Sequence, residues 1–277
     1  MVEKKKQHYI PRFYLKNFAV MPDSEDREPY VFVHSGRAVK HKSPSNTGYI
    51  NYFYRIELEN IDRNYVEDLY SKIESDAKPV IQRVLSLGLD MLSENERYIL
   101  ARFISFLFTR TPKIRDLSHI ALSNSLKTYV NNKVSLERMS KKFDIAHSPA
   151  TGILNSTLEL PKETIMGVTL AAAIRYLPMF ADRNWFLLYT EDLPFVTSDH
   201  PVVLYNPDID HKKVLPGLAF SKTDFYFPLN SHICLYGSYS TIHNSKCSNE
   251  QVCFINSLLN DQKTDLIFAS CDMTGKL

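Results

Sequence analysis

The amino-acid sequence predicts an α+β protein, with a central helical bundle and an antiparallel sheet built mainly from the C-terminal third and the N-terminal segment. Apolar residues recur every three to four positions through much of 57–184, which is the period of an amphipathic helix. Short runs of aromatic and β-branched residues, separated by turn residues, fill 185–277 and recur within 1–56. Helices and strands therefore dominate different parts of the chain, as in α+β proteins.

The N-terminal part, residues 1–56, contains a predicted hairpin and an aromatic stretch. The run YVFVH at 30–34 alternates, and Ser35-Gly36 follows it, so we expect a turn and a second strand at 37–41. The stretch YINYFYRI at 49–56 is interpreted either as a buried strand or as an aromatic plug.

The helical part, residues 57–184, has clear start and stop signals. An apolar repeat that begins at Ile61 ends at Gly88, and Pro79 is expected to kink that helix. Ser93 and Glu96 form a capping box, in which each side chain satisfies a free backbone N–H of the other. This box starts an apolar helix that runs to about 108 and should be central to the core. Further helices are expected over residues 111–131, 135–143 and 161–184.

The remaining part, residues 185–277, has a strand pattern with one helix. The expected helix begins at Ser248 and runs to about Leu259. The expected strands are 185–190, 195–197, 202–205, 225–229, 233–237 and 265–270. The sequence has no internal repeat and no low-complexity segment, so we interpret residues 1–277 as one domain with these three parts.

The charge of the chain is nearly balanced overall but unevenly distributed. The formal net charge is +2, which does not indicate a general polyanion binder. Residues 110–142, however, contain eight basic and two acidic side chains. This basic segment is either a solvated or internally paired helical face, or a surface that binds nucleic acid through its phosphates.

Several classes of protein are disfavoured by what the sequence lacks. The first residues contain no apolar signal segment and no long apolar run follows, so we expect no membrane association and a cytoplasmic location. No P-loop, dinucleotide-binding loop or G-x-S-x-G motif occurs, and eight glycines in 277 residues make a phosphate-cradling loop improbable.

The stretch HYIPRFYLKNF at 8–18 is the first candidate functional segment. Pro11 fixes its own φ and keeps Ile10 extended, so the chain bends rigidly after His8. The aromatic residues that follow can anchor a segment that would otherwise fray. His8 then either hydrogen-bonds a neighbouring loop or is held, together with Arg12, in a cleft.

The stretch PFVTSDHPVVLY at 194–205 is the second candidate segment. Asp199 suits a turn, because its side chain can accept from backbone N–H groups two residues further along the chain, and Pro201 keeps His200 extended. The segment is therefore either a turn that joins two strands, or a carboxylate and an imidazole placed for general base work or metal ligation.

These motifs together resemble a bacterial family of unknown function, the domain of unknown function 4238. The resemblance rests on His8-Tyr9-x-Pro11, on the R-T-P at 110–112 that closes a Phe-rich helix, and on the T-S-D-x-P at 197–201. The family's helical glutamate corresponds to Glu67 or Glu74. The family usually has Val in place of Ile10, a change without physical consequence. The resemblance spans nearly the whole chain and implies no particular activity.

Two functional hypotheses follow for a single polar cleft. In the first, the protein is a hydrolase that acts on a phosphodiester or nucleic acid, with His8, Asp199 and His200 as catalytic residues or metal ligands. Arg12 and Arg110 would bind the anionic substrate, and the cofactor, which is unassigned, could be a divalent metal. In the second, the same residues form a structural clasp, and the protein binds nucleic acid or another partner through its basic 110–142 segment.

Overall fold

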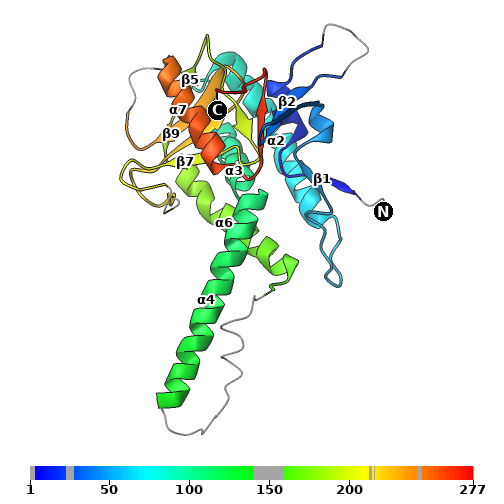
Figure 1. Cartoon of the computed structure of the whole chain (residues 1–277), viewed down its shortest axis with the longest axis vertical. Helices are drawn as coiled ribbons and strands as arrows, with labels where there is room; N and C mark the ends of the chain where they lie inside the picture. The colour runs from blue at the N-terminus through cyan, green and yellow to red at the C-terminus, as the bar shows by residue number, and fades with distance from the viewer. Residues whose placement is uncertain are drawn as a thin grey trace.

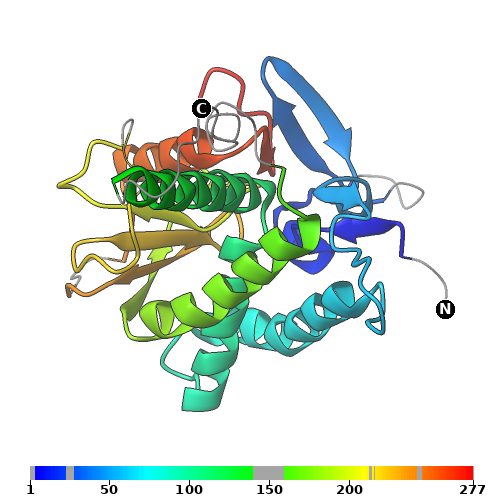
Figure 2. The same ribbon diagram turned by 90° about the horizontal axis from the view of Figure 1, so that it is seen from below.

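A computed structural model gives the arrangement of the chain (Figure 1). It describes residues 4–22, 28–139, 159–211, 214, 216–241 and 245–276, with only the backbone of 130–139. Helices fill the middle of the chain, and antiparallel strands come from its two ends. The α+β class is therefore confirmed. Figure 2 shows the blue N-terminal elements gathered on one side of the helices and the yellow and orange strands on the other.

Helix α3 (Glu94–Thr109) is the centre of the helical part, as the sequence predicts. It begins at the predicted capping box of Ser93 and Glu96 and packs between α2 (Tyr65–Leu87) and α6 (Lys162–Ala181). Most of its length is buried, and Phe103 on its core face is 1% exposed. Helix α2 starts four residues later than Ile61, which is exposed in the preceding turn, and continues through Pro79 to Leu87.

Helix α4 (Pro112–Met139) corrects the prediction of two helices at 111–131 and 135–143. The helix continues through the polar residues after 130, because neither Gly nor Pro interrupts the backbone hydrogen bonds there. The loss of the apolar repeat near residue 131 therefore does not mark the end of the helix. In Figure 1, α4 extends away from the rest of the molecule, with α6 beside its first part. Residues 140–143 lie outside the described residues.

The strands form three antiparallel sheets. The smallest pairs β1 (Lys6–His8) with β4 (Tyr49–Asn51). The second sheet joins the two ends of the chain. Its order is β3 (Ala38–Lys42), β2 (Val31–Ser35), β10 (Leu266–Ala269) and β6 (Thr197–Ser198). The third sheet is entirely C-terminal, in the order β5 (Asn184–Tyr189), β9 (Ile233–Ser238), β8 (Asp224–Pro228) and β7 (Val203–Tyr205).

Two N-terminal predictions are resolved by these pairings. The β2–β3 hairpin turns at the expected place, with Ser35 opposite Ala38 and Gly36 at a φ of +57°. The aromatic stretch at 49–56 fits the aromatic plug better than the buried strand, because the strand found there is largely exposed. Its first three residues form β4, and Phe53 and Tyr54 then turn into the core.

Two further helices complete the part that positions the site. Helix α7 (Asn249–Gln262) begins at a second capping box, formed by Ser248 and Gln251, and covers one face of the third sheet. The short helix α1 (Arg12–Leu15), continued by a 3₁₀ turn over Lys16–Phe18, packs its buried side into the main core beside α2 and α3.

Helix α6 has an apolar composition that invites comparison with membrane helices. Among the described residues, it is the one helix that is long and apolar enough to cross a membrane by these two criteria alone. In the fold it packs along α3 and against α4. The described residues form two hydrophobic core clusters, and α6 contributes Met166, Ala173 and Phe180 to the first.

Candidate functional site

The segment from His8 to Pro11 is fixed by the loop before β4. The backbone N–H groups of Tyr9 and Ile10 both donate to the carbonyl of Gly48, at 3.0 and 3.1 Å. Gly48 has a φ of +65°, and an added Cβ would lie 3.1 Å from the Cβ of Ile10. This position therefore favours glycine for both conformation and space. Pro11 then starts α1 at the bend that the sequence predicts.

Tyr14 connects the two sequence motifs directly. It is fully buried, and its hydroxyl lies 2.7 Å from the hydroxyl of Thr197 and donates to the Pro228 carbonyl at 2.7 Å. Its ring stacks on Phe227, with ring centres 5.1 Å apart. The N-terminal segment and the segment that begins at Thr197 therefore lie side by side.

Arg110 connects the N-terminal segment to α2. Its side chain is 2% exposed, its Nε donates to the Tyr9 carbonyl at 2.8 Å, and its Nη1 pairs with the Glu74 carboxylate at 2.8 Å. Of the two glutamates that the sequence left open, Glu74 is thus the one that pairs with Arg110. Because a buried guanidinium is costly without partners, this arrangement holds the backbone at Tyr9 firmly.

The next residue, Thr111, connects to the second motif. Its hydroxyl lies 2.9 Å from Nδ1 of His200, and the His200 ring lies 5.2 Å from that of Phe108. His200 is 2% exposed, and burial lowers its pKa from 6.5 to about 3. The imidazole is therefore neutral at physiological pH and is enclosed within the protein.

Asp199 uses its carboxylate to close the turn that leads into β10. Its oxygens accept from the backbone N–H groups of Thr264, Asp265 and Leu266, at 2.8, 2.7 and 2.9 Å. The side chain is 2% exposed, and burial raises its pKa while the three hydrogen bonds oppose that rise. This corrects the local turn that the sequence offered as one of two interpretations. Asp199 bonds N–H groups more than sixty residues away in the chain, and the local bond is made by Ser198, whose Oγ accepts from the His200 N–H at 3.1 Å.

We call these contacts among residues 8–14, 110–111 and 197–200 the clasp. The structure brings its three segments together. Asp199, His200 and Arg110 are buried within the clasp. Arg12 is exposed, and its charge and that of Arg110 act on His8.

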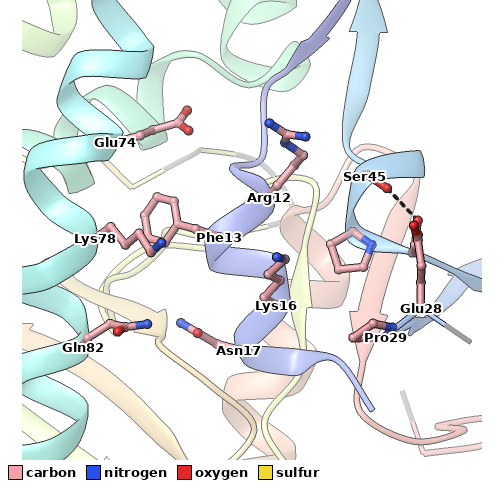
Figure 3. A pocket seen from close by; sticks show the side chains of 12 residues that line it. Arg12, Phe13, Lys16, Asn17, Glu28, Pro29, Ser45, Glu74, Lys78 and Gln82 are labelled. Atoms are coloured by element: carbon pink, nitrogen blue, oxygen red, sulfur yellow. Dashed lines mark hydrogen bonds between the residues drawn. The ribbon is translucent and has the colours of Figure 1, made fainter. Parts of the chain in front are cut away.

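An open groove of about 680 Å³ runs along α1, with α2 on one side of that helix and residues 28–29 and 43–45 on the other (Figure 3). Arg12, Lys16 and Asn17 come from α1 and the 3₁₀ turn that follows it. Figure 3 shows Glu74, Lys78 and Gln82 in a row along the facing side of α2. We call this hollow the α1–α2 groove. Neither Asp199 nor His200 lines it.

His8 lies behind one end of this groove. Its ring is 5.4 Å from that of Tyr49, and it makes a hydrogen bond with the backbone of Ser45, which lines the groove. Its Nε2 is buried and has no hydrogen-bond partner among the described residues. Burial lowers the pKa of His8 to about 4, and the charges of Arg12 and Arg110 act in the same direction.

Sequence reasoning missed Lys78 and Gln82 as groove residues. Their signal was present, since Glu74, Lys78 and Gln82 are four residues apart and must share one face of a helix. The sequence does not show that α1 lies opposite this face of α2. Among the described residues, no group of three or more His, Cys, Asp or Glu side chains is arranged to hold a metal ion.

The basic segment 110–142 begins with side chains that bind within the protein. Arg110 pairs with Glu74, and Lys113 donates to the carbonyl of Gln262 at 2.6 Å. Arg115 donates to the Phe53 carbonyl at 3.3 Å and covers the Phe53 ring. The first three cations of this segment are therefore used internally. The side chains after residue 129 lie outside those that the structure describes.

Nearly the whole chain matches one known family. Residues 6–272 match the family model described as Protein of unknown function (DUF4238). The chain belongs to this family. The DUF4238 match runs from β1 to just beyond β10, so the clasp and the α1–α2 groove both lie within it. No curated protein and no solved structure matches the chain.

The clasp predicts coupled stability effects. Tyr14→Phe and Thr197→Val each leave a buried polar group without its partner, so each should lower the free energy of unfolding by about 1–3 kcal/mol. Because both remove the same contact, the double variant should lose less than the sum by about 0.5 kcal/mol or more. Urea denaturation measures all three. Thr169→Val, a buried threonine on α6 bonded to Met166, is the matched control and should add to Tyr14→Phe. Full additivity for Thr197→Val would contradict the direct link.

Acid should destabilise the protein through His200. Its pKa is about 3 in the folded protein, against 6.5 for an unperturbed histidine, so the unfolded chain binds more protons between these values. The contribution of His200 to the free energy of unfolding should therefore rise with pH over this range, by up to about 1.4 kcal/mol per pH unit, and level off above about pH 6.5. His8 contributes with the same sign, whereas Glu67, whose pKa burial raises to about 7, contributes with the opposite sign.

His200→Gln should lower that slope by the contribution of about one proton. The slope is obtained from denaturation midpoints measured from about pH 4 to 8. Above about pH 7 the parent and the variant should run parallel, which provides the internal control. An unchanged slope below that pH would contradict the assignment to His200.

Proposed function

We propose that the chain binds a phosphate-bearing ligand in the α1–α2 groove. The observation that carries this proposal is the gathering of Arg12, Lys16 and Lys78 around one hollow of about 680 Å³. Among the described residues, no acidic side chain forms a salt bridge with any of the three. The volume lies in the range of small-ligand sites.

The charge balance within the groove supports an anionic ligand. Of the two acidic residues that line it, Glu74 is paired with Arg110, which leaves Glu28 against three cations. Arg12 can bind two phosphate oxygens at once through its planar fork, whereas each lysine supplies a compact charge. The amide of Gln82 adds donors along the same hollow, whereas the Asn17 amide donates to the Leu229 carbonyl at 3.0 Å.

The clasp then serves to position α1. A helix of four residues is not stable alone, so its place depends on what holds it. Tyr14 bonds Thr197, and Arg110 bonds the carbonyl of Tyr9. We therefore propose that Asp199, His200 and Arg110 act in the scaffold, that Arg12 contacts the ligand directly, and that the protein does so in the cytoplasm.

Titration of the protein with tripolyphosphate tests this function. Lys78→Gln should weaken binding roughly two- to fivefold, because an exposed ionic contact contributes about 0.5–1 kcal/mol. Arg12→Gln should weaken binding more, since it removes a bidentate contact. Lys72→Gln is the matched control, because Lys72 is exposed on another face of α2 and does not line the groove. Absence of binding, or equal losses for Lys72 and Lys78, would overturn the proposal.

We propose hydrolysis of a bound phosphodiester as a second candidate function, which His8 supports. Its low pKa keeps the imidazole unprotonated at neutral pH, its Nε2 is unpartnered among the described residues, and the charges of Arg12 and Arg110 are nearby. A neutral imidazole can accept a proton from an attacking water, and for His8 this requires that its buried Nε2 become accessible from the groove. Turnover of bis(4-nitrophenyl) phosphate, with and without added Mg²⁺, should fall by about a hundredfold or more in His8→Ala. Turnover that survives this substitution, or that is absent from the parent, would exclude His8 as the base.

A further inference from the structure

A second hollow of about 670 Å³ adjoins the α1–α2 groove. It shares Glu28 and Ser43 with the groove and is further lined by Tyr30, His41 and Lys42. The two hollows therefore lie next to each other on the surface, with Glu28 and Ser43 at their shared boundary. We call the second one the aromatic hollow.

The aromatic hollow contains a preformed ring stack. The rings of Tyr30 and His41 lie 4.5 Å apart at an angle of 23°, and Phe32 meets the His41 ring edge-on at 4.5 Å. His41 lies directly opposite Phe32 in the β2–β3 pairing, and Tyr30 is bridged to Val20. The rings are thus positioned by backbone pairing, which reduces the entropy lost when a planar group stacks on them.

Cations next to aromatic faces are the combination that binds single-stranded nucleic acid. Phosphates follow the positively charged path while bases stack on the rings. Here Arg12, Lys16 and Lys78 provide the path, and Tyr30 and His41 provide the rings. A duplex keeps its bases stacked inside, so rings that line a hollow can reach only an unpaired strand.

We infer that the ligand of the groove is a single-stranded nucleic acid, whose phosphates lie on the cations of the α1–α2 groove and one of whose bases stacks on the Tyr30–His41 pair. This inference rests on the proposed function and adds the class of ligand and a second contact site. It also moves the nucleic-acid surface away from the 110–142 segment, whose first three cations are bound internally.

The test separates base stacking from phosphate binding with two probes. Fluorescence anisotropy with a labelled oligothymidylate of about 12 nucleotides reports both contacts, whereas tripolyphosphate reports only the cations. His41→Ala should weaken the oligonucleotide about fivefold or more and leave tripolyphosphate unchanged. His41→Tyr should retain the affinity, because it restores a flat ring. His232→Ala, an exposed histidine in the turn between β8 and β9, is the control and should change neither probe.

Salt dependence gives an independent measure of the phosphate contacts. For the oligonucleotide, Lys78→Gln should reduce the slope of log affinity against log salt by about 0.7, while His41→Ala should leave that slope unchanged. A labelled duplex should bind the parent more weakly than the single strand, and His41→Ala should reduce this difference.

Each remaining outcome would contradict either this inference alone or the proposed function together with it. If both probes bind and His41→Ala affects neither, the stacking contact and hence this inference fail, while the phosphate-binding function stands. If polyglutamate competes as well as the oligonucleotide, the site selects acidic polymers generally and the nucleic-acid assignment is wrong. If neither probe binds, the proposed function fails together with the inference.

Discussion

The buried guanidinium of Arg110 determines where the N-terminal segment lies. Its Nη1 pairs with the Glu74 carboxylate on α2, and its Nε donates to the Tyr9 carbonyl. The centre of the Tyr70 ring lies 5.1 Å from the guanidinium carbon. Removing a cation from water costs far more than any single contact returns, so the partners must stay in place together. Because α3 ends at Arg110, this interaction ties the central helix to the first strand and to α2 at once.

Buried hydrogen bonds also hold the C-terminal third against the segments next to Arg110. Thr111 binds His200, Tyr14 binds Thr197, and Asp199 accepts three backbone N–H groups before β10. Residue types that suit general base chemistry are here enclosed and hydrogen-bonded, which is the ordinary state of buried polar groups. The exposed cations that this scaffold presents, Arg12 among them, are where a ligand can be reached. Asp199 and His200, which suit general base chemistry, are thus buried, whereas the cations of the α1–α2 groove are accessible to a ligand.

Predictions from sequence succeeded where the signal was local. Both helix starts at Ser93 and Ser248 depend on a side chain and a backbone group three residues apart, and both caps are present. The hairpin at Ser35-Gly36 depends on a turn that two residues encode. The division of α4 into two helices was wrong because apolar periodicity reports packing, whereas the backbone of a projecting helix can continue without it.

The sequence by itself determined the class of the fold, the helix caps and the hairpin, because each depends on residues close together in the chain, and it placed the chain in the DUF4238 family. Only the tertiary structure decided that Glu74 rather than Glu67 pairs with Arg110, that Asp199 closes a turn formed by residues 264–266, and that Lys78 faces Arg12 across a groove. Those outcomes depend on which elements pack together. A buried polar group takes whichever partner the packing brings within reach, and nothing in the neighbouring residues specifies that partner.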